Sequence, residues 1–93
     1  MIVSFACAET GGIFRGKRSR RLPPDIQHPT RRKLEYLHRA RTLDDMRMPP
    51  GNRLEALKGN RKGQHSVRVN DQWRICFEWR EGNAEQVEIV DYH

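Results

Sequence analysis

The last three residues of the chain, Asp91, Tyr92 and His93, place a carboxylate, a phenol and an imidazole side by side in the sequence. The negative charges of Asp91 and of the terminal carboxylate favour the protonated form of the His93 imidazole. A cationic imidazole can protonate a leaving oxygen or stabilise the charge on a crowded phosphate. These residues therefore predict an acid–base group that acts on a phosphodiester without a metal ion.

RNA is the substrate that demands the least further chemistry, because its own 2′-hydroxyl is the nucleophile. The protein then needs phosphate contacts and a surface that orients a base, and the Tyr92 ring can orient one by stacking. The alternative is that His93 has no role, as is usual for a terminal histidine. A strand is predicted over residues 87–92, however, and a packed strand that ends so close to His93 favours a chain end held in place.

Two arginines are predicted to face each other across a β-hairpin. Residues 73–79 alternate apolar and polar side chains, as a strand with one buried face does. If residues 70–72 form the loop, Arg68 lies opposite Arg74 on the face away from the core. Like charges directly opposite each other destabilise a sheet, and a phosphate bound between them would relieve the repulsion. The alternatives are that the guanidinium groups spread into water or pair with carboxylates of neighbouring strands: Glu55, Glu78 or Glu88.

The charge balance is typical of a protein with a nucleic-acid partner. The 93 residues include 18 lysines and arginines against 12 aspartates and glutamates, which gives a formal net charge of +6 and an isoelectric point near 10.0. Such a basic excess commonly binds RNA or DNA, and the alternative is a solvated surface that only maintains solubility. Residues 15–21, of which five are basic, are open to the same two interpretations.

The length allows one domain, residues 1–93. Cys7 and Cys76 stand far apart without a Cys-x-x-Cys motif, so neither a zinc site nor a disulfide framework is predicted. This use of cysteine fits a reducing cytoplasm, and no apolar run is long enough to span a membrane. We therefore expect a cytoplasmic protein that needs no metal and no cofactor.

The first half of the chain predicts mainly helices. Residues 1–6 are expected to form a strand, and residues 9–14 a short helical turn. Pro29 suits the first position of a helix, and apolar residues follow it at helical spacing: Leu34, Leu37 and Ala40. Thr42 and Asp45 have the spacing of a capping box, which predicts a second short helix.

The second half predicts strands, because β-branched and aromatic residues alternate with polar ones between turn-rich segments. The expected strands are residues 54–58, 65–69, 73–79 and 87–92, with a basic loop at 58–63 and a turn at 81–83. Helices followed by a meander of strands define an α+β fold, in which the helices cover one face of a mainly antiparallel sheet.

Three segments resemble a known family: residues 52–64, 66–77 and 87–93. Their distinctive elements are Leu-x-x-Leu-Lys-Gly, Asn-x-Gln-Trp-Arg and the closing Asp-Tyr-His. Together these are similar to the HigB-type toxins of the RelE/ParE superfamily, strongly over residues 50–93 and loosely over the whole length. The resemblance implies a RelE-like fold, with two N-terminal helices packed on a curved, mainly antiparallel sheet of about four to five strands.

The resemblance also implies an activity and partners. HigB-type toxins cut mRNA in the ribosomal A site by attack of the 2′-hydroxyl, without a metal ion. Their partner is a HigA-type antitoxin, a helix-turn-helix protein that neutralises the toxin and through which alone the toxin reaches operator DNA. The competing interpretations are a non-catalytic poison of DNA gyrase from the same superfamily, and a basic RNA- or ribosome-binding module without chemistry.

Carried over by position, the resemblance assigns catalysis to Asp91, Tyr92 and His93. It assigns phosphate contacts to Arg68, Arg74 and Lys58, and we add two residues of the basic loop as RNA contacts: Arg61 and Lys62.

One position departs from the pattern. Glu55 stands where some HigB-type toxins carry a catalytic histidine. A carboxylate can act as a general base but cannot neutralise a phosphorane, so we expect a slower enzyme or one that depends more on His93 and the arginines.

Overall fold

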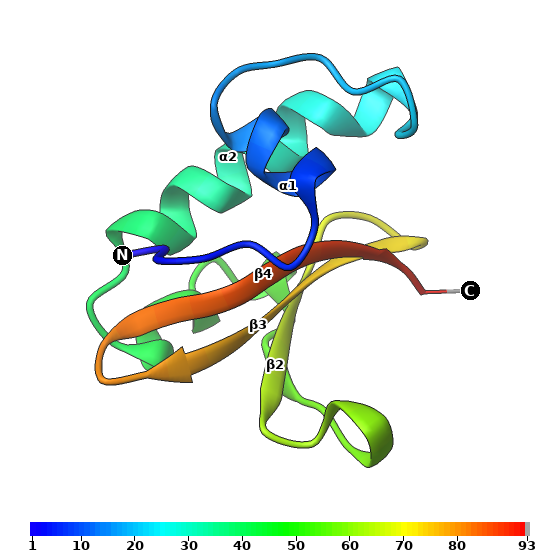
Figure 1. Ribbon diagram of the computed structural model, residues 1–93. Coiled ribbons are helices and arrows are strands. Elements are labelled where there is room, and N and C mark those ends of the chain that lie inside the picture. The colour runs from blue at the N-terminus through cyan, green and yellow to red at the C-terminus, as the bar shows by residue number, and fades with distance from the viewer. Residues whose placement is uncertain (93) are drawn as a thin grey trace.

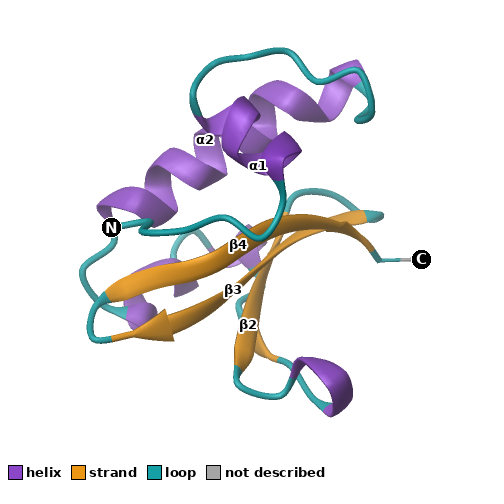
Figure 2. Ribbon diagram, in the orientation of Figure 1, coloured by secondary structure: helices purple, strands orange, loops and turns teal. Residues whose placement is uncertain are grey.

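The computed structural model describes residues 1–92, so the predicted role of His93 lies outside the described residues. Two helices, α1 (Ala8–Phe14) and α2 (Pro24–Arg39), lie on one side of a four-stranded sheet (Figures 1 and 2). Three short 3₁₀ turns, η1, η2 and η3, follow α2 and flank the first strand: Leu43–Arg47, Pro50–Asn52 and Gly59–Arg61. The predicted α+β class with two N-terminal helices is confirmed.

The sheet consists of β1 (Glu55–Ala56), β2 (Gln64–Arg68), β3 (Trp73–Arg80) and β4 (Asn83–Asp91). The strands are adjacent in chain order, and every neighbouring pair is antiparallel. This is the meander that the alternating second half predicted, although β1 is only two residues long.

Strand β4 begins earlier than predicted, at Asn83 instead of Val87, because residues 83–85 also pair with β3. The hairpin is closed by two residues instead of three. Glu81 and Gly82 both have positive φ, 51° and 81°, the geometry of the tight turn that suits twisted hairpins. Arg80 therefore pairs with Asn83.

A bulge divides β4 into two halves. Cys76 pairs with Glu88 and Glu78 pairs with Glu85, so two residues of β4 lie opposite one residue of β3, and Gln86 has a φ of 52°. Such a bulge interrupts a ladder and increases the local twist.

The N-terminal segment follows the edge of β4, but the predicted strand at residues 1–6 is wrong. Only two isolated parallel bridges form, Ile2 with Ala84 and Phe5 with Val87. They lie on either side of the bulge at Gln86, whose N–H bonds the Ser4 hydroxyl (2.9 Å) instead of continuing a regular ladder. The bulge thus explains why this segment does not form a fifth strand.

Helix α2 begins at Pro24 and not, as predicted, at Pro29, which lies inside the helix. Pro24 takes the first helical position, where a proline lacks no intrahelical bond. The buried face of the helix also extends further back than the apolar spacing alone suggested, to Ile26 and Thr30.

The hydrophobic core lies between α2 and one face of the sheet. Leu34 and Leu37 of α2 are fully buried there, and they belong to one cluster with residues of β2, β3 and β4: Val67, Ile75, Phe77 and Val87. The opposite face of the sheet is not covered by α1 or α2 (Figure 2).

The predicted capping box is confirmed at the start of η1. The Thr42 hydroxyl accepts a hydrogen bond from the Asp45 N–H (3.2 Å), and the Asp45 carboxylate accepts from the Thr42 N–H (3.1 Å). Backbone hydrogen bonds from Arg41 and Thr42 lower the pKa of Asp45. The box orients the segment that inserts Met46 into the core.

His65 predicts how stability depends on pH. Its Nδ1 is buried and has no hydrogen-bond partner within residues 1–92, and burial, followed by the charge of Arg47, lowers its pKa. Because the unfolded chain binds this proton more readily, His65 stabilises the fold fully above the ordinary histidine pKa and progressively less below it. We expect the free energy of unfolding, measured by urea titration, to fall between pH 7 and pH 5.

His65→Phe should make that fall smaller. The control is His28→Phe, which removes an exposed imidazole of α2. Equal pH profiles for the two variants would contradict the interpretation.

Candidate active site

The predicted hairpin register is confirmed, since Arg68 pairs with Arg74 and Val67 with Ile75. The Asn70 side chain closes the loop by accepting hydrogen bonds from the N–H groups of Gln72 (2.9 Å) and Trp73 (2.8 Å). Strand alternation places Arg68 and Arg74 on the face opposite the core, as expected.

A row of register partners crosses all four strands on that face. Glu55 of β1 pairs with Ser66 of β2, Ser66 with Cys76 of β3, and Cys76 with Glu88 of β4. Arg74 lies two residues before Cys76 on the same face. The candidate site residues of this row are therefore positioned by strands rather than by flexible loops.

The Arg74 guanidinium is the centre of the site. Only 8% of the residue is exposed, and Nε donates to the Ser66 hydroxyl (2.8 Å). Nη2 donates to the backbone carbonyls of Arg53 (2.6 Å) and Ser66 (3.3 Å) and lies 3.6 Å from a Glu55 carboxylate oxygen. Arg74 therefore pairs with Glu55, which is one of the alternatives that the sequence left open.

Nη1 of Arg74 is not used in this network, because the hydrogen bonds within residues 1–92 engage only Nε and Nη2. A guanidinium group carries five N–H donors in a fixed plane. Arg74 can therefore offer the donors of Nη1 to a phosphate while the rest of the group stays bound to the protein.

The end of β4 is tied to the hairpin loop. The Tyr92 N–H donates to the Gln72 carbonyl (2.6 Å), and the Gln72 side-chain amide donates to the Asp91 carboxylate (3.0 Å). The Tyr92 ring packs on the guanidinium of Arg74 at 5.5 Å from its centroid and remains 43% exposed. Glu55, Arg74 and Tyr92 are thereby brought together.

The remaining predicted residues lie around this centre with different partners. Arg68 forms an ion pair with Asp71, whose side chain is 97% exposed. Arg61 donates to Glu88 (2.9 Å) and to Gln64 (3.0 Å), and the bond to Glu88 raises the pKa of Arg61. Lys58 and Lys62 are exposed at the two ends of η3.

Sequence reasoning missed three residues that shape the site: Ser66, Gln72 and Lys33. Ser66 holds Arg74, and Gln72 holds Asp91 and Tyr92. Gln72 lies within the Asn-x-Gln-Trp-Arg element, so its position in that element could have marked it as a site residue. The pKa of Lys33, on α2, is lowered by burial and by the positive charges of Arg68 and Arg32. Nothing in the helical pattern indicated that Lys33 and Arg68 lie near each other.

Metal-binding clusters and membrane-spanning helices were sought in residues 1–92. Histidine, cysteine, aspartate and glutamate side chains do not gather there in groups of three or more that could hold a metal ion. None of the helices in this part has the length and apolar character needed to span a bilayer.

Comparison with solved structures identifies the fold. YafQ from Escherichia coli superposes with a TM-score of 0.64 over 99% of this chain and 94% of YafQ, at 11% sequence identity. That identity is low, so the match speaks for the fold alone. The class that the structure defines is therefore the fold that this chain shares with YafQ.

Sequence comparison then identifies the family. A family model described as the RelE-like toxin of the type II toxin–antitoxin system HigB matches residues 13–93. Toxin HigB-1 of Vibrio cholerae is 50% identical over 68 residues, which are 73% of this chain and 72% of that protein. Endoribonuclease HigB of Proteus vulgaris is 42% identical over 41 residues, 44% of this chain and 45% of that protein. The chain belongs to the HigB-like toxins of type II toxin–antitoxin systems, which confirms the predicted resemblance and implies an antitoxin partner.

The contacts of Arg74 predict that its guanidinium geometry, and not only its charge, stabilises the fold. Arg74→Lys keeps the charge but cannot reproduce the fork that bonds Ser66 and Arg53. We expect the free energy of unfolding from urea titration to fall by about 1–3 kcal/mol, the usual cost of losing hydrogen bonds to a charged group.

Arg68→Lys is the matched control from the same register pair. Arg68 pairs with an exposed carboxylate, and such surface pairs contribute little, so the change should stay within about 0.5 kcal/mol. Similar losses for both variants would show that Arg74 has no special structural role.

Proposed function

We propose that this protein is a ribosome-dependent endoribonuclease that cleaves mRNA in the ribosomal A site by attack of the 2′-hydroxyl, without a metal ion. The observation that carries the proposal is the contact of Arg74 with both Glu55 (3.6 Å) and the exposed Tyr92 ring (5.5 Å). The related protein from Proteus vulgaris is named as an endoribonuclease, which supports the same activity.

The chemistry divides among the site residues as follows. The Glu55 carboxylate accepts the proton of the 2′-hydroxyl, and the 2′-oxygen attacks the adjacent phosphorus. The bond from phosphorus to the 5′-oxygen breaks, and His93 supplies the proton that this oxygen takes up. The products are a 2′,3′-cyclic phosphate and a 5′-hydroxyl end.

The cations stabilise the charge that develops on the phosphate. Arg74 offers Nη1 from a fixed position, and such preorganised donors are effective because they need no rearrangement during the reaction. Arg68, Lys58, Arg61 and Lys62 contact neighbouring phosphates. Tyr92 stacks on a base, and Asp91 favours the protonated form of His93.

The antitoxin that we propose is a HigA-type helix-turn-helix protein, through which the toxin reaches operator DNA. The proposed place of action is the cytoplasm, where mRNA and ribosomes are found. Family membership supports an antitoxin, and the basic surface supports an RNA substrate.

Removal of Tyr92 and His93 tests the activity. Primer extension on a translated mRNA should show cuts with the native chain, and these should fall by about 100-fold or more without the two residues, as expected when a general acid is lost. Cuts should also require translation.

Two other results would contradict the proposal. Inhibited DNA supercoiling with intact mRNA would indicate a gyrase poison. Ribosome binding without any cleavage would indicate a module without chemistry.

A pair of single variants tests the division of roles. His93→Ala should lower cleavage by about 100-fold or more, and Glu55→Ala should also lower it because the 2′-hydroxyl loses its base. The measurement is the initial rate of cleavage, and the control is His28→Ala, which removes a histidine of α2 outside the candidate site. Unaltered cleavage by Glu55→Ala, with cleavage abolished by His93→Ala, would make Glu55 a bystander.

A further inference from the structure

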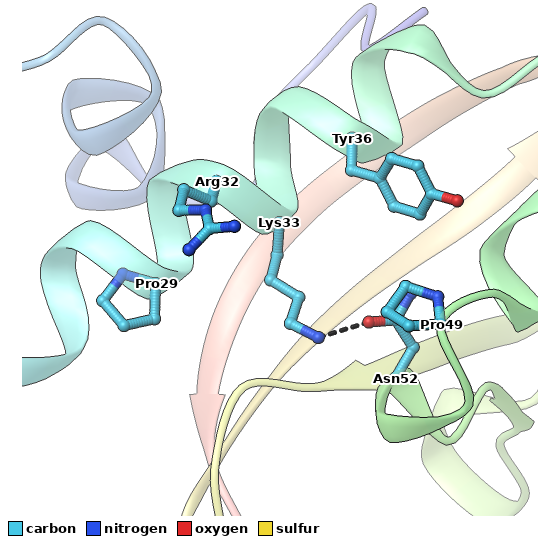
Figure 3. Close-up of a pocket in the computed structure, with 6 residues that line it drawn as sticks. All are labelled: Pro29, Arg32, Lys33, Tyr36, Pro49 and Asn52. Carbon is cyan, nitrogen blue, oxygen red and sulfur yellow. Dashed lines mark hydrogen bonds between the residues drawn. The ribbon is translucent and has the colours of Figure 1, made fainter.

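A pocket of about 440 Å³ lies between α2 and the η2 turn, outside the acid–base site (Figure 3). Its size falls within the range of about 300–1,000 Å³ typical of small-ligand sites. Six residues line it: Pro29, Arg32, Lys33, Tyr36, Pro49 and Asn52.

The pocket contains two cations, Lys33 and Arg32. The Lys33 ammonium donates to the side-chain oxygen of Asn52, a neutral group, as Figure 3 shows. Within residues 1–92, neither Lys33 nor Arg32 has an ion-pair partner, and Arg68 adds a third positive charge nearby.

This arrangement is costly for the protein alone. Burial, Arg68 and Arg32 all lower the pKa of Lys33, which means that they disfavour its charged form. A bound anion would reverse that effect, and phosphate suits lysine and arginine donors.

The Asn52 side chain is locked in place. It is fully buried and donates to the carbonyls of Met46 (3.2 Å) and Met48 (3.3 Å), so its oxygen must point toward Lys33. The Lys33 ammonium is therefore held at one position in the pocket. A fixed, half-buried cation differs from the mobile lysines of an ordinary solvated surface.

The other side of the pocket suits a base. The Tyr36 ring is 40% exposed, and its hydroxyl donates to the Asp45 carbonyl (3.4 Å). Pro29 and Pro49 add further rigid apolar surface. A flat aromatic ring next to paired cations is the combination with which proteins bind single-stranded nucleic acids.

The pocket and the candidate active site are linked by two residues that are adjacent in the chain. Asn52 binds Lys33 in the pocket, and the carbonyl of Arg53 accepts from Arg74 (2.6 Å), which in turn contacts Tyr92. This shared stretch of backbone, with cations at both sites, favours one RNA strand as the ligand of both.

We propose that this pocket binds a nucleotide of the same RNA strand that occupies the acid–base site, with its phosphate on Arg32 and Lys33 and its base on Tyr36. The identity of the ligand as mRNA rests on the proposed function. The pocket acts as a subsite that holds the transcript next to the position of cleavage and takes no part in the bond-breaking step.

The test uses a fluorescent 2′-O-methyl heptanucleotide, which cannot be cut because its nucleophile is blocked. Its affinity for the full chain is measured by anisotropy at several salt concentrations. Arg32→Gln should lower the slope of log affinity against log salt by about 0.7, the contribution of one phosphate on single strands. Tyr36→Leu should weaken binding about fivefold or more with an unchanged slope, as loss of one stacked base does.

The matched control is Arg39→Gln, which removes one charge from the exposed end of the same helix outside the pocket. It should leave the slope near that of the native chain. Equal slopes for Arg32→Gln and Arg39→Gln, or unchanged affinity for Tyr36→Leu, would overturn the proposal. The proposal would also be overturned if the variants weakened the complex with the antitoxin and left RNA binding unchanged.

Cleavage of an unmodified transcript separates this subsite from the catalytic function. Arg32→Gln and Tyr36→Leu should raise KM and leave kcat nearly unchanged. If no transcript is cut but the differences in salt slope and affinity persist, the nuclease assignment fails and the RNA pocket stands. If transcripts are cut and the binding differences are absent, the pocket fails and the nuclease assignment stands.

Discussion

The buried guanidinium of Arg74 is the constraint on which the candidate site depends. A buried charge is costly unless it is paired and hydrogen-bonded. Arg74 meets that demand with groups from three parts of the chain: Ser66 of β2, the Arg53 carbonyl and the Glu55 carboxylate of β1. β1 has only two residues in the ladder, so these contacts fix an edge that pairing alone would hold weakly. The residue that organises the site is also one that stabilises the sheet.

The chain end depends on the same hairpin. Gln72 binds Tyr92 through its carbonyl and Asp91 through its side chain, and the Asn70 side chain determines the shape of that loop. A terminal segment is usually poorly ordered unless it is tied down. Here the ties come from the β2–β3 loop, and the Tyr92 ring rests on Arg74. Asp91 and Tyr92, two of the candidate site residues, are therefore held by contacts with the β2–β3 loop, which suits chemistry that needs a fixed geometry.

The parts of the fold that follow from local pattern could be predicted, and the parts that depend on tertiary contacts could not. Alternation and loop length were enough for the Arg68–Arg74 register, and Thr42 with Asp45 was enough for the capping box. No residue type indicates a positive φ at Gln86, so the bulge and the broken pairing of the N-terminal segment were missed. The contact of Lys33 with Asn52 arises only when α2 packs beside η2, and sequence spacing does not contain that information.

The basic residues of the candidate site differ in how far neighbouring carboxylates compensate their charge. Arg61 and Arg74 are bound to carboxylates on the sheet, Glu88 and Glu55, so much of their charge is already compensated. Arg68 has an exposed partner, and surface pairs of this kind exchange for another anion at little cost. Lys58 and Lys62 are exposed and form no ion pair within residues 1–92. The contacts of Arg74 therefore fix the geometry of the candidate site, whereas the charge of Arg68 and of the two lysines is the least compensated and the most available to an anionic ligand.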